Sequence, residues 1–206
     1  MIGGRILESY DARATYYAAM GLMDSENSTG PLFGPEDLHA LADRGHEVAM
    51  HGFGHLSARA TPVNQFLDDI RHCESALQEH LAERASRNYA YPYGHATLKT
   101  KRQLGPNLRS SRGTIGGVNG PKVDLNLLLA NNLYGDASAL DRAEQLIREN
   151  VARPGWLIFY THDVSDNPSP FGCTPSLLER VVAFAVKSGA KILTIEDVLR
   201  QLSPVD

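Results

Sequence analysis

Short runs of aliphatic, aromatic and β-branched residues alternate along the chain with longer windows in which apolar residues recur every three or four positions. Several of the short runs are apolar on successive residues, which is typical of strands covered on both faces. The predicted strands are residues 14–20, 47–50, 88–91, 127–130, 156–160 and 191–194. This alternation predicts an α/β fold.

The longer windows predict helices. In the longest, which opens at Thr61-Pro62, the spacing of three and four is kept by Phe66, Ile70, Cys73, Leu77 and Leu81. The other predicted helices are 4–10, 35–45, 138–152, 175–187 and 196–202. Four glycines and a proline predict a loop over 113–121. No linker composition interrupts the pattern, so we expect a single domain over residues 1–206.

The amino-acid composition and net charge disfavour several classes of protein. The 206 residues are 42% hydrophobic and 21% charged, as in an ordinary globular protein, and the net charge of −4 disfavours a nucleic-acid partner. No apolar run approaches the roughly 18 residues that span a bilayer. The first residues lack the apolar core of a signal peptide, so the chain as given is expected to be cytoplasmic. Two cysteines a hundred residues apart form neither a metal pattern nor a disulfide framework.

The sharpest chemical signal is the run His-Gly-Phe-Gly-His at residues 51–55, directly after a predicted strand. Histidines at positions i and i+4 of one turn project the same way and can chelate one metal ion. The alternative is a structural or solvated pair. The carboxyl end of a strand in a β/α protein is where such folds place ligands, which favours the metal interpretation of His51 and His55.

Two further segments end predicted strands. Tyr91-Pro92-Tyr93-Gly94 is either a plain turn or a turn that points a backbone N–H into a site, where it stabilises an oxyanion. His162 follows the apolar run 156–160 and is a candidate general acid or ligand, with a buried structural histidine as the alternative.

Taken in order, these segments resemble the polysaccharide deacetylases of the nodulation-protein-B homology domain, carbohydrate esterase family four, over nearly the whole chain. Residues 14–17, Ala-Thr-Tyr-Tyr, resemble the family's Ala-Thr-Phe-Phe strand. Residues 45–55 resemble its second motif, a Gly-His-Glu strand that ends in two metal-binding histidines. Residues 89–94 resemble the third motif, and residues 160–163, Tyr-Thr-His-Asp, resemble the fifth.

The resemblance implies a distorted (β/α) barrel of seven to eight strands that binds a divalent metal, usually zinc. The implied reaction is hydrolysis of an N-acetyl or O-acetyl group on an oligo- or polysaccharide. His51 and His55 would bind the metal, and His162 would be the general acid. Tyr93 would lend its backbone N–H to the oxyanion. The residues expected to contact substrate are Tyr91, Pro92, Tyr160 and Arg112, the last in a loop over 109–113.

The chain also departs from the family pattern. The first motif, Thr-Phe-Asp-Asp-Gly, supplies the catalytic base and the third metal ligand, but the thirteen residues before Ala14 contain only Asp11. Ala90 replaces an arginine of the third motif, Tyr160 replaces a leucine, and the fourth motif has no clear match. We therefore expect an N-terminally incomplete chain without the first strand, without a third protein ligand, and with impaired activity.

Two other functions remain open from the sequence. One is a non-catalytic carbohydrate-binding or interaction domain with the same fold, and the other is a metal amidohydrolase that acts on a small non-sugar amide. A missing barrel strand would leave unpaired sheet edges, which favours a homo-oligomer.

Overall fold

The computed structural model describes residues 1–27 and 30–202, which form two compact units. The first, the large-sheet unit, consists of Thr15–Gly113, Asp124–Leu128 and the residues from Thr194 onward. The second, the small-sheet unit, consists of Met1–Ala14, Thr114–Val123 and Leu129–Leu193. Each unit is described separately below. The expectation of a single domain stays a prediction.

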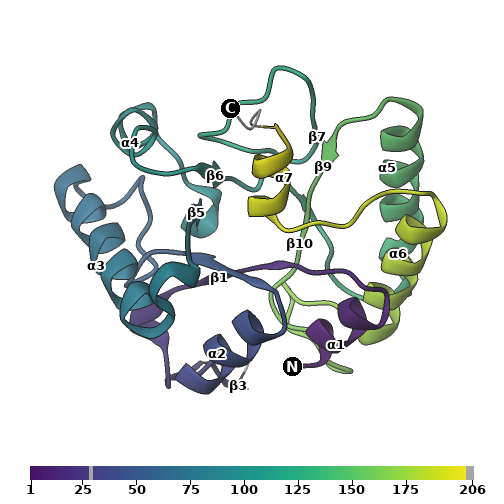
Figure 1. The fold of residues 1–206 in the computed structure, drawn as a ribbon, viewed down its shortest axis with the longest axis horizontal. Helices are drawn as coiled ribbons and strands as arrows, with labels where there is room; N and C mark the ends of the chain where they lie inside the picture. Colours follow the sequence, from purple (N-terminus) through teal and green to yellow (C-terminus); the bar gives the residue numbers. More distant parts are fainter. Residues whose placement is uncertain (28–29, 203–206) are drawn as a thin grey trace. The chain divides into compact units, whose positions relative to one another are not determined.

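The large-sheet unit is built on four parallel strands in the order β1-β4-β5-β6. These strands are β1 (Thr15–Ala18), β4 (Glu47–Met50), β5 (Ala85–Ala90) and β6 (Ser110–Arg112). Its helices are α2 (Pro35–Asp43), α3 (Val63–Leu81), α4 (Leu98–Leu104) and α7 (Ile195–Leu202), as Figure 1 shows. A two-stranded antiparallel ribbon, β2 (Glu26–Asn27) with β3 (Gly30–Pro31), lies between β1 and α2 in sequence.

The small-sheet unit holds four strands of two residues each. β8 (Asn131–Asn132) pairs in parallel with β10 (Phe159–Tyr160), and β7 (Val118–Asn119) pairs antiparallel with β9 (Trp156–Leu157). Its helices are α1 (Ile2–Ser9), α5 (Leu140–Ala152) and α6 (Pro175–Lys187). Helix α6 packs against both α1 and α5 (Figure 1).

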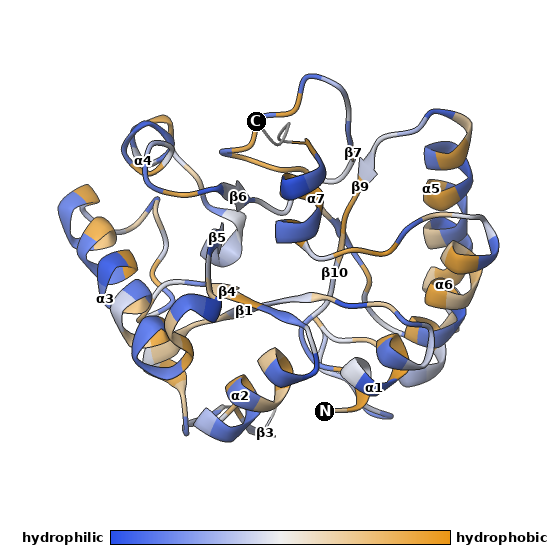
Figure 2. Cartoon of the chain, viewed as in Figure 1, coloured by the Kyte–Doolittle hydropathy of each residue, from blue (hydrophilic) through white to orange (hydrophobic). Residues whose placement is uncertain are grey.

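Helix α3 forms because its apolar residues fall on one face. The buried positions repeat the predicted stripe, and Figure 2 shows apolar and polar sides along the helix. The fully buried Phe66 stacks its ring parallel to that of Tyr91 at 6.5 Å and meets Tyr89 edge-on at the same distance. The core of this unit therefore lies between α3 and the sheet.

The α/β fold class with parallel strands and helices is confirmed, and so are all six predicted helices, with shifts of a few residues at their ends. The predicted strand over 127–130 is wrong, because Leu128 makes one isolated bridge to Arg112 and the strand lies at β8 instead. The predicted strand over 191–194 is also wrong. Thr194 there caps α7, with its hydroxyl oxygen 3.1 Å from the Asp197 backbone nitrogen.

The loop predictions need correction as well. Residues 113–121 contain β7, and the expected loop over 109–113 contains β6, which pairs with β5 through Ser110, Ser111 and Arg112. The predicted strand 156–160 is divided into β9 and β10, which pair with different partners. Strands this short carry too few residues for an alternating pattern to distinguish them from loops.

Helix α4 was not predicted, because it presents few apolar positions. Its start is fixed by a reciprocal cap, in which the Thr97 hydroxyl oxygen accepts from the Thr100 backbone N–H at 3.1 Å and the Thr100 hydroxyl oxygen accepts from Thr97 N–H at 3.0 Å.

Removing this cap is expected to destabilise the protein slightly. Thr97→Ala leaves the Thr100 N–H without its acceptor and should lower the free energy of unfolding by about 1 kcal/mol. Thr97→Ser keeps the hydroxyl and should recover most of this loss. Urea denaturation of the three proteins measures the effect, and equal midpoints for Thr97→Ala and the wild type would contradict the capping role.

Arg112 ends β6 and Tyr17 lies in β1, the two outer strands of the four-stranded sheet. The Arg112 guanidinium lies 4.8 Å from the centre of the Tyr17 ring. A cation at this distance from an aromatic ring is attracted to the face of the ring.

Among the helices in the described residues, none is long and apolar enough to cross a membrane.

Candidate functional site

Two histidine side chains converge at the carboxyl end of β4. The His51 backbone N–H donates to the Ala18 carbonyl at 2.9 Å, which continues the pairing of β4 with β1 beyond the last strand residue. The Nε2 atoms of His51 and His55 lie 3.2 Å apart, and the two rings meet at 75°. The turn between them therefore brings two imidazole nitrogens to one point.

The other nitrogen of His51 is held by the main chain. Nδ1 lies 2.8 Å from the carbonyl oxygen of Ala90, at the end of the neighbouring strand β5. A carbonyl only accepts, so Nδ1 carries the proton in this contact, and Nε2 keeps its lone pair in the neutral ring. Metal-binding histidines are held by this kind of contact.

The spacing of the two nitrogens fits a shared metal ion. Zinc–nitrogen bonds of about 2.0–2.1 Å at a tetrahedral angle place two ligand nitrogens about 3.3 Å apart. The observed separation is 3.2 Å. Within residues 1–27 and 30–202, no group of three His, Cys, Asp or Glu side chains could hold a metal. The two histidines could therefore hold a metal ion as two of its ligands, and the described residues provide no third.

A carboxylate and a thiol near the histidine pair make hydrogen bonds to other groups. The Asp69 carboxylate on α3 accepts hydrogen bonds from the backbone N–H groups of Phe53 and Gly54. Burial raises the pKa of Cys73 to about 11, so its thiol stays neutral near pH 7, and it contacts the Ala18 carbonyl. Neither group is a metal ligand in this arrangement.

Tyr93 lies beside the histidine pair. Its ring meets that of His55 at 4.7 Å and that of His95 at 5.6 Å, and the side chain is 62% exposed. Tyr93 and His55 have φ values of 58° and 54°, in the left-handed region that non-glycine residues rarely adopt. Backbone strain of this kind persists where the surroundings hold it, and it often marks functional sites.

The other predicted substrate contacts in this unit differ in exposure. Pro92 is buried, and Tyr91 is 1% exposed with its ring in the core against Phe66. The packing gives Tyr91 a structural role, and its contact with substrate stays a prediction. Arg112 is partly buried at the end of β6, over the Tyr17 ring.

His162 and Tyr160 belong to the small-sheet unit. His162 is exposed, and both its backbone nitrogen and its Nδ1 lie 3.1 Å from the Phe171 carbonyl oxygen. The ring of Tyr134 contacts those of Tyr160, His162 and Phe171 at 5.6, 6.1 and 5.9 Å. These contacts fix the His162 ring, with Nδ1 toward the backbone, among aromatic neighbours.

Asp163, the next residue, is held by the loop that follows it. Its carboxylate accepts from the backbone N–H and the hydroxyl of Ser169. Burial acts to raise the pKa of Asp163, but these hydrogen bonds and the nearby His162 charge outweigh it and lower the pKa. The structure thus places a carboxylate that favours its charged form next to His162 in the chain.

Sequence reasoning missed Asp69. A signal was present, since Asp69 lies between Phe66 and Ile70 on the apolar stripe of α3, where a carboxylate is costly unless it is paired. The partner could not be read from the sequence, because it is the backbone of the loop that carries the histidines.

Comparison with protein families gives one match. The model for polysaccharide deacetylases matches residues 4–107 of this chain, a range that includes both His51 and His55. Comparison with curated proteins gives no match.

Solved structures with a similar fold include proteins with related titles. A Mycobacterium smegmatis protein described as a polysaccharide deacetylase aligns with a TM-score of 0.63 at 13% identity, covering 97% of this chain and 75% of that one. A variant of the peptidoglycan deacetylase PdaC from Bacillus subtilis aligns with a TM-score of 0.56 at 15% identity, covering 98% and 84%.

Another similar structure is covered to a smaller extent. A Bacillus anthracis protein described as a polysaccharide deacetylase aligns over 57% of this chain with a TM-score of 0.48 at 16% identity, and the chain spans 36% of its length. At these identities, the likeness of the two preceding structures establishes the fold alone.

Proposed function

This chain belongs to the polysaccharide deacetylase family, and from that premise we propose that it is a metal-dependent hydrolase that removes N-acetyl or O-acetyl groups from a carbohydrate. The observation that carries the proposal is the 3.2 Å approach of the His51 and His55 Nε2 atoms at the carboxyl end of β4. In β/α folds this is the end of the sheet at which ligands bind.

His51 and His55 would hold the divalent metal, and the imidazole ligands and their spacing favour zinc. A metal bound there would polarise the acetyl carbonyl and lower the pKa of a bound water. The Nδ1 contact of His51 with Ala90 keeps its Nε2 directed at the ion.

The contacts of this chain support three further roles in the proposed reaction. Tyr93, held in a left-handed turn beside His55, would present its backbone N–H to the oxyanion. His162, with Nδ1 anchored on the Phe171 carbonyl, would protonate the leaving amine through Nε2. Four residues would contact the sugar: Tyr91, Pro92, Arg112 and Tyr160.

The proposal includes slow turnover. In the described part of the chain the two histidines have no carboxylate beside them that could complete a metal site. Water or an exogenous anion would then fill the remaining coordination positions, and the described residues would offer no carboxylate of a metal site to take the proton from the attacking water. A general base contributes roughly 10²–10⁴-fold to such reactions.

An acetylated chito-oligosaccharide tests this function. Incubation of the protein with zinc is expected to release acetate slowly, and mass spectrometry should show the matching loss of acetyl groups. EDTA should abolish the reaction because it removes the metal, and added zinc should restore it. Acetate release that persists in EDTA would contradict the proposal.

The absence of a third ligand among the described residues also favours a second candidate function, a non-catalytic carbohydrate-binding domain. This alternative predicts that the oligosaccharide binds with the same affinity in zinc and in EDTA and keeps every acetyl group. Isothermal titration calorimetry under both conditions, alongside the acetate assay, separates the two functions.

A further inference from the structure

The loop between the two histidines is held by hydrogen bonds on two sides. On one side it is bonded to the chain that follows β1, where the Met20 N–H donates to the Gly52 carbonyl at 3.2 Å and the Gly21 N–H donates to the Phe53 carbonyl at 2.9 Å. These bonds use the carbonyl groups of the loop and leave its N–H groups to be satisfied elsewhere.

Asp69 satisfies them from the other side. Its Oδ2 accepts from the Phe53 N–H at 2.9 Å, and its Oδ1 accepts from the Gly54 N–H at 2.7 Å. Asp69 is 9% exposed, so these are charge-assisted bonds in a largely water-free environment. A single buried carboxylate thus binds two successive amides immediately before His55.

The glycines of the loop make this approach possible. A Cβ atom on Gly52 would lie 2.7 Å from Asp69 Oδ2, and one on Gly54 would lie 3.2 Å from Asp69 Oδ1. Gly52 also has a φ of +79°, which side chains rarely adopt. The His-Gly-Phe-Gly-His sequence therefore matches a loop that closes on the Asp69 carboxylate.

We propose that Asp69 is a positioning residue, which fixes the loop so that His55 Nε2 converges with His51 Nε2. The proposal rests on the proposed metal-binding function. His55 itself has a φ of 54°, a strained conformation that two charge-assisted bonds on the preceding residues hold in place. Asp69 acts through the loop backbone and touches neither metal nor substrate.

The test compares Asp69→Asn with two control variants. Asn keeps the size of the side chain but replaces one accepting oxygen with a donor that cannot bond an N–H. Asp68→Asn makes the same change on the exposed neighbour, which pairs with Arg71. Leu77→Ala removes a buried side chain two turns further along α3 and is expected to lower the melting temperature through a core cavity.

Zinc affinity is measured by competition with a chelating dye, and the geometry of the site by the visible absorption of bound Co²⁺. Asp69→Asn is expected to bind zinc 10–100-fold more weakly, the usual effect of losing an outer-shell partner, and to alter the Co²⁺ spectrum. Asp68→Asn and Leu77→Ala should match the wild type in both. Unchanged affinity in Asp69→Asn, or an equal loss in Leu77→Ala, would overturn the proposal.

Hydrogen exchange gives a readout without metal. In the apoprotein, the amides of Phe53 and Gly54 should exchange faster in Asp69→Asn than in the wild type, while the core amides of β4 keep their protection. Unchanged exchange at Phe53 and Gly54 would refute the loop-holding role. A wild type that binds no zinc but shows this exchange difference would refute the proposed function and leave the loop contact standing.

Discussion

Replacing His51 with alanine is expected to weaken zinc binding more than 100-fold, beyond the 10–100-fold loss typical of an outer-shell partner. The variant loses one of the two converging nitrogens and the contact with Ala90 that orients it. A single remaining imidazole binds a divalent ion no better than many exposed histidines do. The dye-competition assay measures the loss, and His55→Ala should behave the same way.

The matched control is His39→Ala, which removes an exposed imidazole from α2. His39 contacts His80, and their ring centres lie 6.3 Å apart. We expect no change in zinc affinity on this substitution. Equal losses in His39→Ala and His51→Ala would show that zinc binds histidines on the surface without selection.

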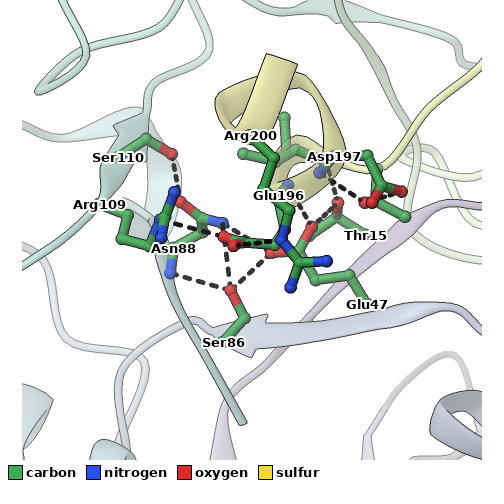
Figure 3. A network of polar contacts seen from close by, with 11 residues as sticks. Thr15, Glu47, Ser86, Asn88, Arg109, Ser110, Glu196, Asp197 and Arg200 are labelled. Atoms are coloured by element: carbon green, nitrogen blue, oxygen red, sulfur yellow. Dashed lines mark hydrogen bonds and ion pairs between the residues drawn. The ribbon is translucent and has the colours of Figure 1, made fainter. Parts of the chain in front are cut away.

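The second large effect is expected at Glu47, the first residue of β4. Glu47 is 8% exposed, and its carboxylate accepts four hydrogen bonds (Figure 3). The donors and their distances are Thr15 Oγ1 at 2.6 Å, Ser86 Oγ at 2.5 Å, Asn88 Nδ2 at 2.7 Å and the Glu196 backbone nitrogen at 3.0 Å. These groups come from β1, β5 and the first turn of α7.

Glu47→Ala should lower the free energy of unfolding by about 3–5 kcal/mol, because hydrogen bonds to a charged group contribute roughly 1.5–3 kcal/mol each and several are lost together. The four donors lose their shared acceptor, and α7 loses a carboxylate at its positive end. Urea denaturation measures the change, with the exposed Glu79→Ala on α3 as a control of equal charge. A loss below about 1 kcal/mol would show that water replaces the carboxylate.

A substitution at Glu47 is expected to change the stability of the fold without changing zinc binding. Glu47 begins β4, whereas His51 follows the end of the same strand, so the hydrogen-bond network and the proposed metal site lie at opposite ends of the sheet. In β/α folds the amino ends of the strands serve stability and the carboxyl ends serve chemistry. Under folding conditions, Glu47→Ala should therefore keep the zinc affinity of the wild type.

Much of the helical structure could be predicted from the sequence, because a helix buries one face and leaves a period in its own residues. Helix α3 shows this directly, since its buried positions include every residue of the predicted stripe. The run 191–194 misled the same reasoning, because apolar residues that lead into a capped helix look like those of a buried strand. The strands of the small-sheet unit depend on partners such as Asn131 and Phe159, far apart in sequence.

Part of the candidate site could also be predicted from local sequence, and the rest depends on tertiary packing. The spacing of His51 and His55 after a strand is a local pattern, and it predicted two side chains that the structure brings together. The part played by Asp69 depends on α3 packing against the loop, fourteen residues beyond His55, and only the fold shows it. Tyr91 was assigned by its motif alone, and its burial against Phe66 follows from tertiary packing.

X-ray absorption at the zinc edge of the loaded protein tests whether His51 and His55 bind one metal ion, because it counts the imidazole ligands and measures their distances. We expect one zinc per chain with two imidazole nitrogens at about 2.0–2.1 Å and oxygen atoms in the remaining positions. The imidazole signal should disappear in His51→Ala. Sulfur ligands, or an unchanged spectrum in that variant, would show that these two histidines do not hold the metal.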